Sequence, residues 1–209
     1  FCAAYVLPGI FGRDPWRNAD QAAFGYMLAM AEGRTPWWAP TVGSVPIENA
    51  LLPHWLGAAT IAALSPWVDA PLAARLPFGF LLAMVLVLTW YAAFQLARTE
   101  AAQPVPFAFG GEADVVGYSR AIADGALLAL IATLGLLQLG HETTPELVQL
   151  FAAALALWSL AAAPYRRWRA RGSMLLALPL LAASGAPTIA VSFGAIGSLI
   201  AWRSQYEQG

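Results

Sequence analysis

Side chains that could do chemistry gather in three short polar stretches of an otherwise apolar chain. The first stretch, DPWRNADQ at residues 14–21, places two aspartates and an arginine directly after an apolar run. The second, PIENALLPHW at 46–55, contains a glutamate and a histidine, and the third, GHETTPE at 140–146, contains a histidine and two glutamates. Carboxylates can act as general bases, arginines can stabilise anions, and carboxylates or imidazoles can bind a divalent metal. The elements around these stretches must decide which of these roles is possible.

The composition indicates a chain whose main surroundings are lipid. Of 209 residues, 59% are hydrophobic and 11% are charged, and the mean hydropathy is +0.61, whereas a soluble core of this size needs a more polar surface. The formal net charge of -1 gives no general attraction to nucleic acid. The single cysteine, Cys2, cannot form an internal disulfide, and we interpret it as a buried apolar residue.

Hydropathy predicts several membrane-spanning helices. The opening FCAAYVLPGI is half the length of a span, so it is interpreted as the tail of a first transmembrane helix, with a signal-peptide remnant as the alternative. Two later segments, 173–184 and 187–202, are short, and Pro179 interrupts the first of them. They are either two thin spans or one re-entrant pair. The predicted spans are 76–97, 121–139 and 145–163, followed by the short segments 173–184 and 187–202.

The arginines predict the orientation. PYRRWRARG at 164–172 is interpreted as a short basic loop, and such loops stay in the cytoplasm. Counting back from it, residues 99–120 form a cytoplasmic connector and residues 11–75 lie on the outer face. Residues 51–67 are too short for a comfortable span and are predicted to lie in the interface. If they did span, residues 11–50 would be cytoplasmic instead.

Two amphipathic helices are expected in the outer segment, each with a carboxylate near its N-terminus. Phe24, Met27, Leu28 and Ala31 form one apolar stripe of a helix that starts near Asp20. Asp20 could simply cap that helix. Glu48 precedes the second helix, and Trp37 and Trp38, between the two, are expected to anchor in the membrane interface.

These features stand in a recognisable order: Asp20-Gln21, GRTPWWAP at 33–40, PIENALLPHWL at 46–56 and AARLP at 73–77. Over residues 11–98 this order resembles the first periplasmic loop of the polytopic GT-C glycosyltransferases, the aminoarabinose-transferase and protein-O-mannosyltransferase-like group of glycosyltransferase family 39. That family has an Asp-Glu pair, an amphipathic helix, a Gly-x-Trp-x-x-Pro turn, then Tyr-Phe-Glu-Lys-Pro-Pro-Leu-x-Tyr-Trp-Leu and an Ala-Ala-Arg-Leu-Pro entry into the next span. The rest of the chain matches by topology only.

The chain departs from the family pattern at several positions. Gln21 replaces the second acid of the pair, Asn49 stands in place of the lysine, and Ala50 and Leu51 replace the two prolines. The cation that is lost at position 49 would help to hold a phosphate. Arginines at 13, 17 and 34 could supply it, or they could contact lipid headgroups only.

The resemblance implies an all-α fold, a polytopic integral membrane helical bundle with a large outer loop of interfacial amphipathic helices, as one transmembrane domain over 1–209 that is an N-terminal fragment. It implies a glycosyltransferase of the bacterial inner membrane that moves a sugar from a polyprenyl-phosphate-linked donor to an acceptor at the outer face. Its partners would be a lipid-linked sugar phosphate and membrane lipids, and no nucleic acid. The implied site residues are Asp20 as catalytic carboxylate, Glu48, Arg13, Arg17, Arg75 and His54 for substrate, and Glu48, His141 and Glu142 for a divalent metal.

Plainer interpretations remain open beside these. Asp14 is typical of a turn, Arg75 of a residue that extends to the interface, and the GHETTPE stretch of a turn whose Thr144 caps the next helix. Asp124, inside a predicted span, could be paired with Arg120. The chain as a whole could be a non-catalytic lipid-binding or assembly subunit on the same scaffold, and a small transporter is disfavoured because its polar residues would lie at mid-span. Walker, HExxH, CxxC and nucleophile-elbow motifs are absent.

Overall fold

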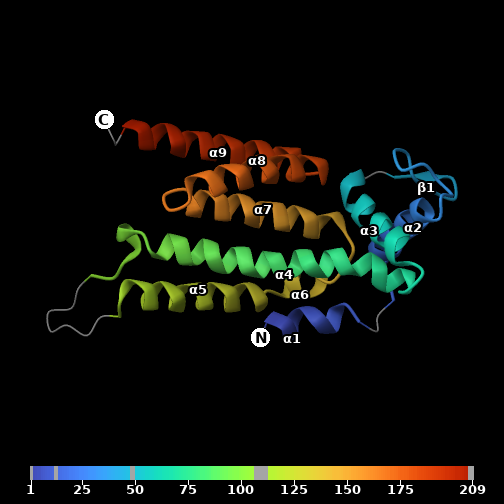
Figure 1. The fold of residues 1–209 in the computed structure, drawn as a ribbon, viewed down its shortest axis with the longest axis horizontal. Helices are drawn as coiled ribbons and strands as arrows, with labels where there is room; N and C mark the ends of the chain where they lie inside the picture. Colours follow the sequence, from blue (N-terminus) through green and yellow to red (C-terminus); the bar gives the residue numbers. More distant parts are fainter. Residues whose placement is uncertain (1, 12–13, 48–49, 106–112, 207–209) are drawn as a thin grey trace.

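The computed structural model describes residues 2–11, 14–47, 50–105 and 113–206, and the regular secondary structure of these residues is helical apart from one small hairpin (Figure 1). The prediction of an all-α fold is confirmed. The elements, in chain order, are α1 (Cys2–Val6), η1 (Leu7–Gly9), α2 (Asn18–Ala31), β1 (Thr41–Val42), β2 (Val45–Pro46), α3 (Leu51–Leu64), α4 (Ala70–Ala97), η2 (Glu100–Ala102), α5 (Val115–Ile131), α6 (Leu134–Leu139), α7 (Pro145–Ala162), α8 (Arg167–Ala183) and α9 (Pro187–Tyr206).

Long helices form a row in the order α5, α4, α7, α8, α9, with neighbours in contact; α4 and α7 run in the same direction, and the other neighbouring pairs run in opposite directions (Figure 1). The segment formed by α2, α3 and the hairpin packs at the end of the row where α4 begins. We call this the α2–α3 end. The turn between α7 and α8 lies at the other end of the row, the α7–α8 end (Figure 1). The three polar stretches therefore lie at the end of the row where α4 and α7 have their N-termini.

Helix α4 is the central helix of the fold and contacts α2, α3, α5 and α7. Its 28 residues extend over about 42 Å. Asp69 is extended and a proline occupies the first turn, where its missing N–H costs nothing. The helix begins at Ala70, six residues before the start of the predicted span 76–97. Leu82 and Leu86 are fully buried on its inner side.

Among the described residues two helices, α4 and α7, are long and apolar enough to cross a membrane, a property that the buried core helix of a soluble protein can share. Helix α7 matches the predicted segment 145–163 almost residue for residue. The predicted span 121–139 is wrong, because α5 ends at Ile131 and the separate α6 begins at Leu134. Between them the backbone of Thr133 is extended. The Thr133 hydroxyl donates a hydrogen bond to the Leu130 carbonyl, so a side chain satisfies this carbonyl where α5 ends.

The C-terminal half of the row differs from the expected loop and short segments. The basic stretch 164–172 is wrong as a loop, because α8 begins at Arg167. Pro179 lies inside α8 and does not end it, and α8 and α9 are separate antiparallel helices of 17 and 20 residues. Gly185 joins them with φ at 95°, a left-handed conformation that favours glycine.

Helices α2 and α3 pack tightly against each other and against α4. The buried face of α2 centres on Ala23, Met27 and Met30, one position from the predicted stripe, with Met27 common to both. On α3, Gly57 lies so close to this face that an added Cβ would sit 2.3 Å from the Met27 sulfur. Cys2 is exposed, so its interpretation as a buried residue is wrong.

Candidate functional site

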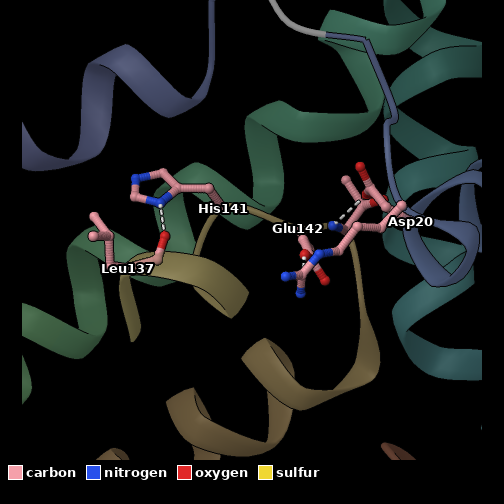
Figure 2. Close-up of polar contacts among 6 residues, drawn as sticks. Asp20, Leu137, His141 and Glu142 are labelled. Carbon is pink, nitrogen blue, oxygen red and sulfur yellow. Dashed lines mark hydrogen bonds and ion pairs between the residues drawn. The ribbon is translucent and has the colours of Figure 1, made fainter. Parts of the chain in front are cut away.

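Asp20 fastens α2 to the turn that precedes α7. Its carboxylate is 1% exposed, and its Oδ1 accepts hydrogen bonds from the backbone N–H of Thr143 at 2.9 Å and from the Thr143 hydroxyl at 2.7 Å (Figure 2). The two residues are 123 positions apart in the chain. Arg17, not Asp20, precedes the helix, so the interpretation of Asp20 as an N-cap is wrong. The structure thus joins the first polar stretch to the third.

A second contact runs beside the first. Arg17 Nη1 lies 3.2 Å from Glu142 Oε1, with the arginine 38% and the glutamate 2% exposed. The geometry is that of an ion pair rather than a directed hydrogen bond. Within the described residues, Asp20 Oδ2 is buried and accepts no hydrogen bond. Two buried carboxylates thus meet at this turn, and Arg17 pairs with one of them, Glu142; buried charge of this kind is costly for stability and typical of functional sites.

His141 leaves this turn in the opposite direction from Glu142 (Figure 2). Its Nδ1 lies 3.3 Å from the carbonyl of Leu137 and its Nε2 lies 3.0 Å from the carbonyl of Tyr5. Gly9 makes room for the ring, because a Cβ there would lie 1.8 Å from His141 Cδ2. Since both ring nitrogens face carbonyls, His141 and Glu142 do not converge on one metal position. No cluster of three metal-ligating side chains occurs in the described ranges, which omit Glu48.

Arg75 lies inside the fold. It is on the second turn of α4 and is 3% exposed, so its interpretation as a residue that extends to the membrane interface is wrong. Arg75 and His141 line a cavity of about 10 Å³ together with Gly9, Gly79 and Gly140. This volume is enough for about one water molecule and is far too small for a sugar.

His54 is buried where α3 meets α2. Its Nδ1 lies 3.0 Å from the Ala50 carbonyl, and its ring meets the Tyr26 ring edge-on at 5.8 Å. Tyr26 in turn donates to the Pro46 carbonyl at 3.1 Å, which fixes the hairpin. Burial lowers the pKa of His54, because the charged imidazolium would lose its water. A direct contact of His54 with substrate therefore requires this packing to open.

The buried imidazole of His54 predicts a loss of stability in mild acid. Its pKa in the folded protein is below the ordinary value of 6.5, so the unfolded chain binds the proton more readily. The contribution of neutral His54 is complete above about pH 7 and decreases as the pH falls toward 5. We expect the thermal unfolding midpoint to fall over this range, and to fall less in His54→Leu. An equal pH dependence in both proteins would contradict this assignment.

The remaining predicted residues fall in different places. Glu48 and Arg13 lie outside the described residues. Arg34 pairs with Glu32 on the surface, away from Asp20, and Thr144 precedes α7 without a side-chain capping bond. Asp124 accepts a hydrogen bond from Trp90 Nε1 at 2.7 Å, and no ion pair with Arg120 occurs among the described residues, so that pairing is not found.

Thr143 is the functional candidate that sequence reasoning missed. A single threonine in a turn has no characteristic spacing, and its role follows only from its contact with Asp20. An apolar cavity of about 230 Å³ ends at the same turn, with Leu136, Leu139, Gly140 and Leu147 in its walls. The turn at 142–143, which holds the contacts of Asp20 and Glu142, is thus only a few residues along the chain from residues that line an apolar cavity.

No family model matches this chain, and no curated protein or solved structure matches it.

Proposed function

We infer that this chain is a polytopic membrane protein that transfers a sugar from a polyprenyl-phosphate-linked donor at the outer face of a bacterial inner membrane. The helical row supports a membrane location. Large apolar side chains are exposed along every long helix, as lipid contact requires and a water-facing surface would not favour. Examples are Phe80, Val87, Leu128, Leu157, Leu175, Val191 and Leu199.

The two ends of the row differ in a way that supports the orientation. Exposed tryptophans Trp16, Trp38 and Trp67 accompany the α2–α3 end, as in the aromatic belt of a membrane interface. Arginines 166, 167, 169 and 171 accompany the α7–α8 end, and basic turns stay in the cytoplasm. The α2–α3 end, with Asp20 and Glu142, would then face outward.

The observation that carries the proposed activity is the contact between Asp20 and the turn at 142–143. It brings together two buried carboxylates and an arginine from separate segments. An apolar cavity suited to part of a lipid chain is lined by Gly140 and Glu146, on either side of this turn in the chain. Sugar transfer needs a base for the acceptor and positive charge for the departing phosphate. Asp20 would take the proton of the acceptor hydroxyl, as that oxygen bonds to the anomeric carbon. The bond from this carbon to the phosphate oxygen breaks, and Arg17 would stabilise the phosphate that leaves.

The transfer assay tests this activity directly. The full-length protein, reconstituted in vesicles, is supplied with a radiolabelled polyprenyl-phosphate sugar and an extract of candidate acceptors. We expect release of polyprenyl phosphate with transfer of the label to an acceptor. Absence of turnover under all donors, with the protein intact in the vesicles, would contradict the proposal.

Cysteine labelling tests the orientation. On a Cys2→Ser background, a cysteine at Ala50 is expected to react with an impermeant thiol reagent added to intact cells, because α3 starts at the α2–α3 end. A matched cysteine at Ala163, in the exposed turn before α8, is expected to react only after the membrane is permeabilised. The reverse pattern would invert the topology and place Asp20 in the cytoplasm.

A second function, a non-catalytic lipid-binding or assembly subunit, is favoured by one observation. Asp20 is closed off in this structure, because it is 1% exposed, Thr143 occupies its Oδ1, and it lines neither of the two cavities described above. For catalysis, the contact between α2 and the 142–143 turn must open when substrate binds. A protein that retains lipid through purification but turns over no donor would support the subunit and exclude the transferase.

A further inference from the structure

Four exposed arginines, Arg166, Arg167, Arg169 and Arg171, form a group at the α7–α8 end that the proposed activity does not use. We call it the arginine cluster. None of these four arginines forms an ion pair with a carboxylate of the described residues. Like charges three and four positions apart repel each other, and positive charge near a helix N-terminus is unfavourable. The cluster therefore costs stability unless an anion binds to it.

The fold holds the cluster on a rigid helix. Ala170, Ala177 and Leu181 are buried against α7, at the spacing of one helix face. The Ser159 hydroxyl on α7 donates to the Ala170 carbonyl and fixes the first turns of α8. The four arginines and Trp168 are nevertheless exposed at this end of the helix.

Aromatic rings surround the cluster at the level of the turn. Trp168 is 80% exposed, and the Arg171 guanidinium lies 5.4 Å from the centre of its ring. At the end of α4, Arg98 lies 4.9 Å from the centre of the Tyr165 ring. Cationic groups beside exposed tryptophan and tyrosine are typical of the headgroup region of a membrane.

The outward face of α8 changes from cationic to apolar within one turn. Arg167, Arg171 and Leu175 follow one another at intervals of four residues, and Leu175 is 74% exposed. Its neighbour Leu176 is exposed as well. A nucleic acid or an acidic soluble protein would match the arginines and leave these leucines in water. A bilayer matches both, because the phosphate layer lies directly above the hydrocarbon.

We propose that the arginine cluster is a binding surface for the phosphate groups of anionic lipids, which dock on the outward face of α8 with their acyl chains along Leu175 and Leu176. This proposal rests on the membrane location argued above but not on sugar transfer. The bound lipid neutralises the repulsion among the arginines and holds the α7–α8 turn at the membrane surface. Each guanidinium near such a surface contributes to binding, and the contribution decreases with salt.

The selectivity of lipid retention tests the proposal. The full chain is purified from mixed vesicles of phosphatidylglycerol and phosphatidylcholine, and the ratio of the two lipids that remain bound is measured. We expect phosphatidylglycerol to be enriched, and the enrichment to fall about tenfold, or 1.4 kcal/mol, when all four arginines are changed to glutamine. Arg34→Gln, at the other end of the row, is the matched control and should leave the enrichment unchanged. Equal retention of both lipids by the unmodified chain would overturn the proposal.

A second measurement avoids any change to the arginines. Brominated phosphatidylglycerol is expected to quench more tryptophan fluorescence than brominated phosphatidylcholine, and Trp168→Phe should remove most of this difference. Equal quenching by the two lipids, or an unchanged difference in Trp168→Phe, would overturn the proposal. Recovery of the chain in the soluble fraction after an alkaline wash would overturn it as well. Asp20→Asn is expected to leave the lipid selectivity intact, so failure of the transferase activity and failure of the lipid surface are distinguishable.

Discussion

Replacing Asp20 by asparagine is expected to reduce sugar transfer by the full-length protein about a hundredfold or more, which is the usual contribution of a general base. Asparagine has nearly the same size, and its amide oxygen can still accept the two hydrogen bonds from Thr143. The fold and the membrane insertion should therefore persist, whereas the side chain can no longer take a proton. The rate of donor turnover, normalised to protein recovered in the membrane, measures the effect.

Asp14→Asn is the matched control for this variant. Asp14 is an acid in the same polar stretch, but it is exposed and lies before α2. We expect its transfer rate to stay near that of the unmodified protein. Retained transfer in Asp20→Asn would remove Asp20 from the role of base, and equal losses in both variants would indicate an effect of net charge on the outer face.

Replacing Arg17 by methionine is expected to destabilise the protein by about 2 kcal/mol, because it leaves the carboxylate of Glu142 buried and unpaired. The expected cost is below that of a fully buried pair, since the arginine itself is partly exposed to solvent. Arg34→Met is the matched control, because its partner Glu32 is exposed and such surface pairs contribute about 0–1 kcal/mol. Chemical unfolding in detergent measures both variants.

The double variant Arg17→Met, Glu142→Gln separates the ion pair from general disruption. Neutral glutamine removes the buried charge, so we expect the double variant to recover most of the stability that Arg17→Met loses. Additive losses in the double variant, or equal losses in Arg17→Met and Arg34→Met, would contradict the assignment of this pair as the support of the 142–143 turn.

The long helices could be predicted from hydropathy because their apolar runs are uninterrupted. The segment 145–163 is an example, and α7 occupies nearly all of it. The prediction failed where a local side-chain contact competes with the helix, as at Thr133, which stops the segment 121–139. It also failed at Arg167, because a dense group of arginines is typical of a loop although arginine itself favours helices.

The site could be predicted only in part. The resemblance to a glycosyltransferase loop drew attention to Asp20, but nothing local to residue 20 indicates a partner as distant in sequence as Thr143. The burial of His54 and Arg75 was not predictable from residue type, because histidine and arginine usually lie at surfaces. Their burial depends on which faces of α3 and α4 pack together, and these faces are set by contacts such as that of Gly57 with Met27.

The stop at Ile131 makes α5 a short neighbour of a long helix. Its 17 residues extend over about 25 Å, less than the roughly 30 Å of hydrocarbon in a bilayer. In the membrane location proposed above, a bilayer matched to α5 alone would be thinned on that side by several ångströms. The protein would therefore favour thin regions of the membrane and attract other short helices to that side.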